Sequence, residues 1–165
     1  MADVARRADV AKGTVFRHFA SKEDLIAALV SDHLHALTAV ARGLLASMDP
    51  GAALLQFLTV AADERRQHDL TFLQTVTGSD STVGEIRAEL YAVIESLVDR
   101  ARAAGALRQD ITGTDVILLM CAPVHVVEYL QDPEPDLWRR YLGIIFDGLR
   151  PGGATPLPHD APARI

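Results

Sequence analysis

The 165-residue chain contains a single cysteine, Cys121. One thiol excludes a disulfide framework within the chain and a multi-cysteine metal site, and it suits a reducing cytoplasm. Long apolar runs are also lacking. The longest, residues 116–127, contains Pro123 and His125 and is shorter than the stretch of about 20 residues that a membrane span needs. The N-terminal residues lack the apolar core of a signal peptide. These absences predict a soluble cytoplasmic protein without a membrane partner.

Signatures of catalysis are missing as well. The chain has no nucleophile elbow, no phosphate-binding loop and no paired metal-ligand motif. His33 and His35 do not form a metal pair, because residues two apart do not share a helix face, and we expect both at the surface. We therefore predict that the protein is not an enzyme and needs no cofactor or metal. An enzyme built on a helical bundle stays open as the weakest alternative.

Lysine is scarce, and its placement is informative. The only two lysines, Lys12 and Lys22, lie in the first 22 residues. Residues 5–22 carry five basic side chains and one acidic side chain, whereas residues 31–165 carry 11 basic and 18 acidic ones. The overall net charge of -6 thus hides a basic head on an acidic body. Such asymmetry indicates that the N-terminal end meets phosphates.

Helical periodicity dominates the chain, and no long stretch alternates apolar and polar residues as a half-buried strand would. We predict an all-α fold with a small head and a larger helical body, followed by a tail from Pro151 that is rich in proline and glycine and disordered. The expected helices span about 2–8, 12–19, 21–47, 52–67, 70–76, 82–104, 116–130 and 136–149.

Helix ends are marked by local chemistry. Three pairs match the capping box, in which a hydroxyl and a carboxylate three residues later satisfy free amides: Ser21 with Asp24, Thr82 with Glu85, and Thr112 with Asp115. Gly105 is placed to end a helix from the position after the cap. Pro123 should kink the apolar helix over 116–130.

The first 22 residues fit a helix-turn-helix. That motif needs a supporting helix with a small residue at the crossing, a turn that accepts an unusual backbone angle, and a second helix with a polar outer face. Ala5, Asp9 and the segment 12–18 meet these needs in this order. Asp tolerates the left-handed conformation that such a turn often requires.

The second helix would lie in the major groove of double-stranded DNA. Gly13 would let the helix approach the sugar-phosphate backbone closely, and Thr14 and Arg17 would reach base edges. His18 and Lys22 are placed for phosphate contact, since Lys22 also lies at the start of the next helix, where free amides favour anions. The alternative without a DNA-binding role is an ordinary basic helical hairpin, which does not explain the order of residues in the segment 12–19.

Residues 4–25 resemble the TetR family of bacterial regulators. The resemblance is carried by Val4-Ala5-x-x-Ala8-Asp9-Val10-Ala11-Lys12-Gly13-Thr14-Val15-Phe16-Arg17-His18-Phe19-x-Ser21-Lys22-Glu23-Asp24-Leu25. Weaker similarity lies in Gly105-x-Leu107-Arg108-x-Asp110 and in residues 141–150. The resemblance implies a small DNA-binding domain, a larger helical domain that binds an effector and forms a homodimer, and repression that a ligand relieves.

The sequence departs from the family pattern in three ways. Asp9 stands where glycine is usual, and Phe16 stands where tyrosine is common, so Phe16 would contact DNA by van der Waals forces only. The chain also begins inside the second helix of the family's DNA-binding domain, and we expect the natural protein to begin upstream with Met1 internal. Without the first helix, part of an apolar face would be exposed to solvent. This face consists of Val4, Ala8, Val15, Phe19 and Leu25.

The body holds candidates for an effector pocket, since such pockets are mostly apolar with a few polar anchors. The candidates are Phe57, Phe72, Gln74, Tyr91, Cys121, His125 and Trp138. The aromatic residues fit a plain core equally well. Cys121, His125 and Tyr129 share a face at spacing i, i+4, i+8, which favours a packed or interface stripe over a metal or acid-base site, because no partners for such a site are evident.

We therefore predict residues 1–30 as a partial helix-turn-helix domain, residues 31–150 as an effector-binding and dimerisation domain, and residues 151–165 as a disordered tail. The partners would be palindromic operator DNA, a small-molecule effector and a second copy, paired through the last two helices at about 112–149. The alternative is a dimeric small-molecule-binding protein that no longer binds DNA because its first helix is missing.

Overall fold

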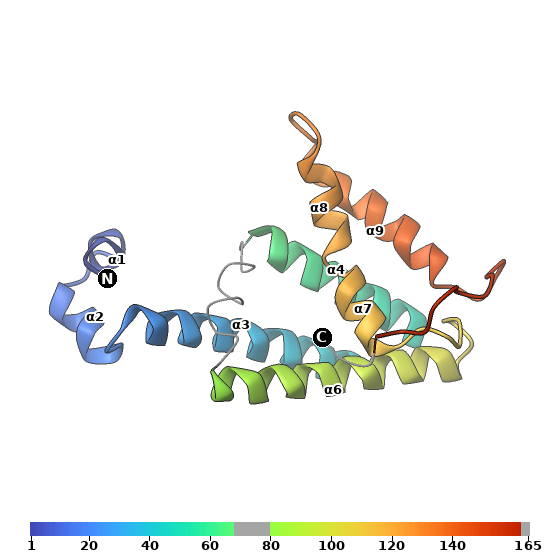
Figure 1. Ribbon diagram of the computed structural model, residues 1–165, viewed down its shortest axis with the longest axis horizontal. Coiled ribbons are helices and arrows are strands. Elements are labelled where there is room, and N and C mark those ends of the chain that lie inside the picture. The colour runs from blue at the N-terminus through green and yellow to red at the C-terminus, as the bar shows by residue number, and fades with distance from the viewer. Residues whose placement is uncertain (68–79, 163–165) are drawn as a thin grey trace.

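The computed structural model describes residues 1–67 and 80–162, which contain eight α-helices and no strand. The predicted all-α fold is therefore confirmed. The expected helix over 70–76 lies outside the described residues. The observed helices are α1 Ala2–Arg7, α2 Lys12–His18, α3 Lys22–Leu44, α4 Pro50–Gln67, α6 Ser81–Ala103, α7 Gly113–Leu119, α8 Ala122–Glu128 and α9 Leu137–Gly148 (Figure 1).

α1 and α2 form the helix-turn-helix at one end of α3 (Figure 1). Ala5 is buried at the crossing. The turn places Asp9 in the left-handed region at φ 53°, as expected for a residue that tolerates it. The Val10 amide donates to the Ala5 carbonyl at 3.0 Å and closes the turn.

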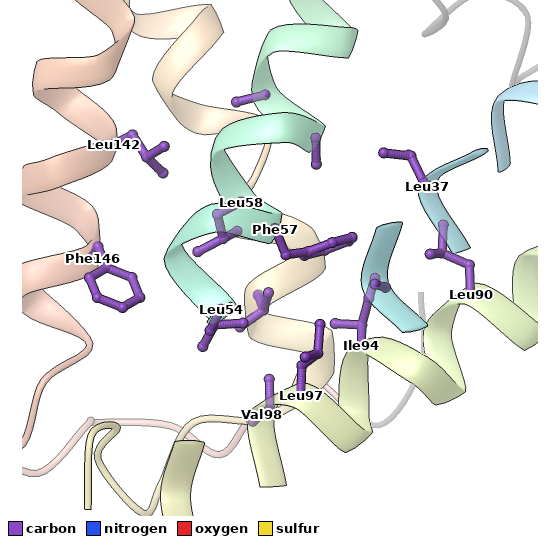
Figure 2. Packing of buried hydrophobic residues seen from close by; sticks show 14 of the residues in the cluster. Leu37, Leu54, Phe57, Leu58, Leu90, Ile94, Leu97, Val98, Leu142 and Phe146 are labelled. Atoms are coloured by element: carbon purple, nitrogen blue, oxygen red, sulfur yellow. The ribbon is translucent and has the colours of Figure 1, made fainter. Parts of the chain in front are cut away.

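α3, α4 and α6 build the body. α3 and α6 lie side by side, and α4 packs against both. Figure 2 shows α4 side chains between two partners, with Phe57 directed towards α3 and α6 and Leu58 towards Leu142 of α9. Phe57 is fully buried, and burying a side chain of this size is worth about 1.5–3 kcal/mol. The core therefore joins the first and last helices of the body through α4.

α3 also has the length and apolar composition of a possible membrane span, and it is the one such helix in residues 1–67 and 80–162. Its apolar residues Val30, Leu34 and Leu37 are buried in the core of the body. Their burial is that of a core helix, which passes the same test of length and composition.

Two of the predicted capping boxes are confirmed. Ser21 accepts from the Asp24 amide at 3.0 Å, and Thr112 accepts from the Asp115 amide at 3.3 Å, with both reciprocal bonds present. Gly105 follows α6 with φ 70°, and its amide donates to the Arg102 carbonyl, as predicted for a glycine after the cap.

Two predictions of helix ends were wrong. The N-cap of α6 is Asp80, whose carboxylate accepts from the Thr82 and Val83 amides, so Thr82 does not begin a capping box with Glu85. The apolar segment 116–130 is not one kinked helix. It is interrupted around Cys121 and splits into α7 and α8, because Pro123 has no amide to continue the hydrogen bonds of α7 and instead occupies the first turn of α8.

α8 and α9 pack together on the side of the body away from the helix-turn-helix (Figure 1). The tail, residues 151–162, contains no helix or strand and is almost entirely exposed. Arg108 anchors it by donating to the Thr155 carbonyl at 2.5 Å.

Candidate functional site

The proposed DNA-contacting residues lie on α2 and at the start of α3, and six of the seven are exposed at the surface of the head. α2 is fixed from its inner side by Val15, which is buried, and by the half-buried Phe19. Thr14 is half-buried, and the other proposed contacts are exposed: Lys12, Gly13, Phe16, Arg17, His18 and Lys22. The packing thus leaves the polar side of α2 free for a ligand.

Gly13 lies in the first turn of α2 in open space. A Cβ added at this position would have nothing within 4 Å. The fold therefore does not require glycine here, although glycine costs about 0.8–1.0 kcal/mol relative to alanine inside a helix. A requirement for close approach by an outside partner would explain its presence.

Positive charge gathers around this surface. The Lys12 ammonium lies 5.6 Å from the centre of the Phe16 ring, a cation–π contact that orients both side chains. Lys22 is the first residue of α3, held there by the capping box of Ser21 and Asp24. Arg6 is an exception because it pairs with Asp3 at 2.8 Å. Lys12, Arg17 and Lys22 are exposed cations of the head.

The apolar cover of the head is partial. Val4 and Phe16 are 42% and 44% exposed. Ala8 is exposed, and Leu25 is half-buried. Of the apolar residues expected to lose cover, only Val15 is buried.

A cavity of about 80 Å³ lies in the body between α3, α4, α6 and α7. Seven of its lining residues are apolar, from Leu34 on α3 to Met120 after α7. Five are polar or titratable: His33, Arg65, Arg87, Tyr91 and Cys121. An apolar cavity with a few convergent polar groups is the usual form of a small-molecule site.

The candidates for the effector pocket fall into four groups. Tyr91 and Cys121 line the cavity, whereas Phe57 and Trp138 are fully buried in the core and His125 is exposed on α8. Phe72 and Gln74 lie outside the described residues. Sequence reasoning did not propose Arg65 and Arg87, although Arg87 precedes Tyr91 by four residues and so shares its helix face.

His33 is not the surface residue we expected. Its side chain is only 14% exposed, and its Nδ1 atom lies 3.7 Å from Oε2 of Glu64 on α4. The reason is helical geometry: His33 neighbours Val30 and Leu37, three and four residues away, which form the buried face of α3. His35 is exposed, as expected.

Arg65 and Arg87 bring positive charge to the cavity wall. Burial raises the pKa of the Tyr91 phenol, the nearby Arg87 guanidinium acts in the opposite direction, and Cys121 adds to the rise. Arg65 reaches towards α8, where its Nη2 atom lies 3.5 Å from Nε2 of His125. His125 Nδ1 lies 2.9 Å from Glu128. A chain of contacts therefore runs from the cavity wall to the outer surface of α8.

That outer surface is apolar in part. Val126, Tyr129 and Leu130 are 40%, 90% and 46% exposed, and Ile144 on α9 is 56% exposed. These large apolar side chains are exposed on α8, on α9 and on the segment between the two helices. The predicted stripe of Cys121, His125 and Tyr129 is therefore divided: Cys121 lines the cavity, whereas His125 and Tyr129 are exposed.

A helix-turn-helix with an open, basic outer face, joined to a helical body with an internal cavity, defines an all-α DNA-binding transcription regulator. Comparison with protein families agrees. Residues 1–29 match the model for bacterial regulatory proteins of the tetR family, and residues 49–151 match the model for the C-terminal domain of SbtR-like transcriptional regulators. The chain belongs to the TetR family, whose members are non-enzymatic, cytoplasmic DNA-binding proteins.

Solved structures support this membership. A TetR transcriptional regulator from Streptomyces coelicolor is 28% identical, with a TM-score of 0.66 over 90% of this chain and 85% of its own. A TetR transcription regulatory protein from Mycobacterium vanbaalenii is also 28% identical, with a TM-score of 0.61 over 90% of this chain and 81% of its own. No curated protein sequence matches the chain significantly.

Proposed function

We propose that this TetR family regulator is a homodimeric repressor, which binds palindromic operator DNA and is released by a small molecule. In this proposal residues 1–30 contact the DNA, residues 31–150 bind the effector and dimerise, and the protein acts in the cytoplasm. The observation that carries the proposal is that one helix, α3, touches both sites. It begins at Lys22 beside α2 and contributes His33, Leu34 and Leu37 to the cavity.

α3 can act as a rigid lever between these sites. At 1.5 Å per residue, the cavity residue Leu34 lies about 18 Å along the axis from Lys22. A ligand that widens the cavity must displace α3 or its neighbours, since a packed core does not deform continuously. Movement of α3 would carry α2 with it and change the spacing of two recognition helices in a dimer.

Dimerisation is supported by the exposed apolar residues of α8 and α9. Two copies that share these helices would form a four-helix arrangement with the heads on the far side of each body. A dimer suits the function, because a single recognition helix covers few base pairs, whereas two helices about one turn of DNA apart recognise a palindrome.

Within the head, Arg17 and Thr14 would contact base edges and give sequence preference. Lys12, His18 and Lys22 would contact phosphates, and Phe16 would pack against the sugar-phosphate backbone. The assignment is supported by the open space around Gly13 and by the exposure of all these side chains except Thr14, which is half-buried. Phosphate contacts position the protein and base contacts specify the site.

The test of this mechanism joins two readouts on the full chain. A small molecule that raises Tm in a ligand screen is added at saturation, and operator affinity is measured by fluorescence anisotropy. The distance between heads is measured by pulsed electron paramagnetic resonance, with a spin-labelled unnatural amino acid at position 23 in place of Glu23, so that Cys121 of the cavity wall stays unchanged. We expect weaker operator binding and an altered distance between labels. Unchanged affinity together with unchanged distance would contradict release by an effector.

A further inference from the structure

The two charged side chains that line the cavity between α3, α4, α6 and α7 are both cationic. They are Arg65 and Arg87, and no carboxylate lines the cavity among the residues that the structure describes. This sign contrasts with the chain as a whole, which has a net charge of -6. Glu64 is directed to His33 and is not part of the lining. The cavity therefore repels cations and attracts anions.

Arg87 differs from most arginines of the body in having no carboxylate partner among the described residues, and it differs from Arg140 in being half-buried rather than exposed. Arg42, Arg66, Arg102, Arg108, Arg139 and Arg150 each form an ion pair with a carboxylate, and Arg100 donates to two carbonyls. Arg87 is half-buried, and within residues 1–67 and 80–162 its one interaction is electrostatic, with Tyr91. A guanidinium withdrawn from water without a partner is unfavourable. An anionic ligand would provide the Arg87 guanidinium with a partner.

The rest of the cavity wall sets the shape of that anion. Leu34, Leu37, Leu90, Ile94 and Ile117 provide the apolar part of the same cavity wall. The volume of about 80 Å³ is roughly half that of the engineered 150 Å³ cavity that binds benzene, so a ligand with a body of that size requires the cavity to widen. Tyr91 lies one turn from Arg87 on α6, where its phenol can donate to the same anion.

We propose that the effector of this protein is a small organic carboxylate, whose apolar body fills the space between α3, α6 and α7 and whose carboxylate is bound by Arg87. This inference rests on the proposed effector site and names its ligand class. A carboxylate matches the planar, two-pronged donor geometry of a guanidinium. Arg65 adds positive charge from α4 while keeping its contact to His125.

Isothermal titration calorimetry on the full-length chain, at constant ionic strength, tests the proposal. The probes are benzoate and hexanoate, each compared with its neutral amide, and inorganic phosphate. We expect a carboxylate to bind and its amide to bind much more weakly. Arg87→Gln should weaken carboxylate binding about 10- to 100-fold, the range expected for a lost charged hydrogen bond, whereas Arg87→Lys should lose less because the charge stays.

The matched control is Arg140→Gln, which removes an exposed arginine of α9 and should leave the affinity unchanged. Equal binding of acid and amide, equal binding of phosphate, failure of both carboxylates to bind, or full affinity in Arg87→Gln would each overturn the inference. Operator release is measured separately on the same samples. A carboxylate that binds through Arg87 without releasing DNA would support the ligand class and contradict the proposed repressor mechanism.

Discussion

Replacement of Gly13 by alanine separates DNA binding from folding. The new methyl group meets no atom of the protein within 4 Å. Since Gly13 lies in α2, alanine should stabilise the head by up to about 1 kcal/mol through helix propensity. If α2 approaches the sugar-phosphate backbone at Gly13, the same methyl must push the helix away from the groove. We expect operator affinity to fall at least about tenfold, which corresponds to roughly 1.4 kcal/mol.

The assay is fluorescence anisotropy on operator DNA, with thermal unfolding in parallel. Gly84→Ala is the matched control, because Gly84 lies in α6 and also has nothing within 4 Å of an added Cβ. Both variants should keep or raise Tm, and only Gly13→Ala should lose operator affinity. Operator affinity that is unchanged or higher in Gly13→Ala would refute close approach at this position.

Three further predictions concern single side chains. Arg17→Ala should cost about 1–3 kcal/mol of operator affinity and relax preference at one base pair, measured on a set of single-base operator variants. Gly113→Ala should lower stability by about 1–3 kcal/mol in thermal unfolding, because its Cβ would lie 3.1 Å from the Glu95 Cα atom and would also meet the Glu95 carboxylate; a Tm like that of the original chain would contradict this packing. The hydrogen bond from Arg108 lowers the pKa of Asp110. The Arg108–Asp110 pair therefore stabilises the fold above the ordinary Asp pKa of about 3.9, and this contribution is lost as the pH falls through the lower pKa of Asp110 in the folded protein. Tm should therefore fall more steeply below pH 4 in the original chain than in Asp110→Asn, and parallel Tm curves would rule out the pair.

Features that depend on local chemistry were predictable from the sequence. The left-handed turn at Asp9, the capping boxes of Ser21 and Thr112 and the stop at Gly105 each depend on a few neighbouring residues. The same locality explains the misplaced start of α6. Asp80 and Thr82 both suit an N-cap, and the sequence motif does not show which of them lies one residue before the helix.

The cavity was harder to predict because four helices and the segment after α7 assemble it. Tyr91 and Cys121 were among the candidates and lie on its wall, whereas Phe57 and Trp138 pack in the core. Aromatic character alone does not distinguish these environments. Arg87 carried a usable signal, a basic residue at i–4 from a tyrosine on an apolar helix face. That it has no acidic partner within residues 1–67 and 80–162 is visible only in three dimensions.

The central claim is that the basic surface around α2 binds specific DNA, and selection of genomic fragments by the full chain tests it most directly. The selection is made at two salt concentrations, with Lys22→Ala in parallel. We predict enrichment of a palindrome with half-sites about 10 base pairs apart. Binding should weaken as the salt concentration rises, and this salt dependence should be smaller in Lys22→Ala by about one phosphate contact per head. Absence of any enriched sequence above the Lys22→Ala control would contradict the account and leave ligand binding by the body as the function.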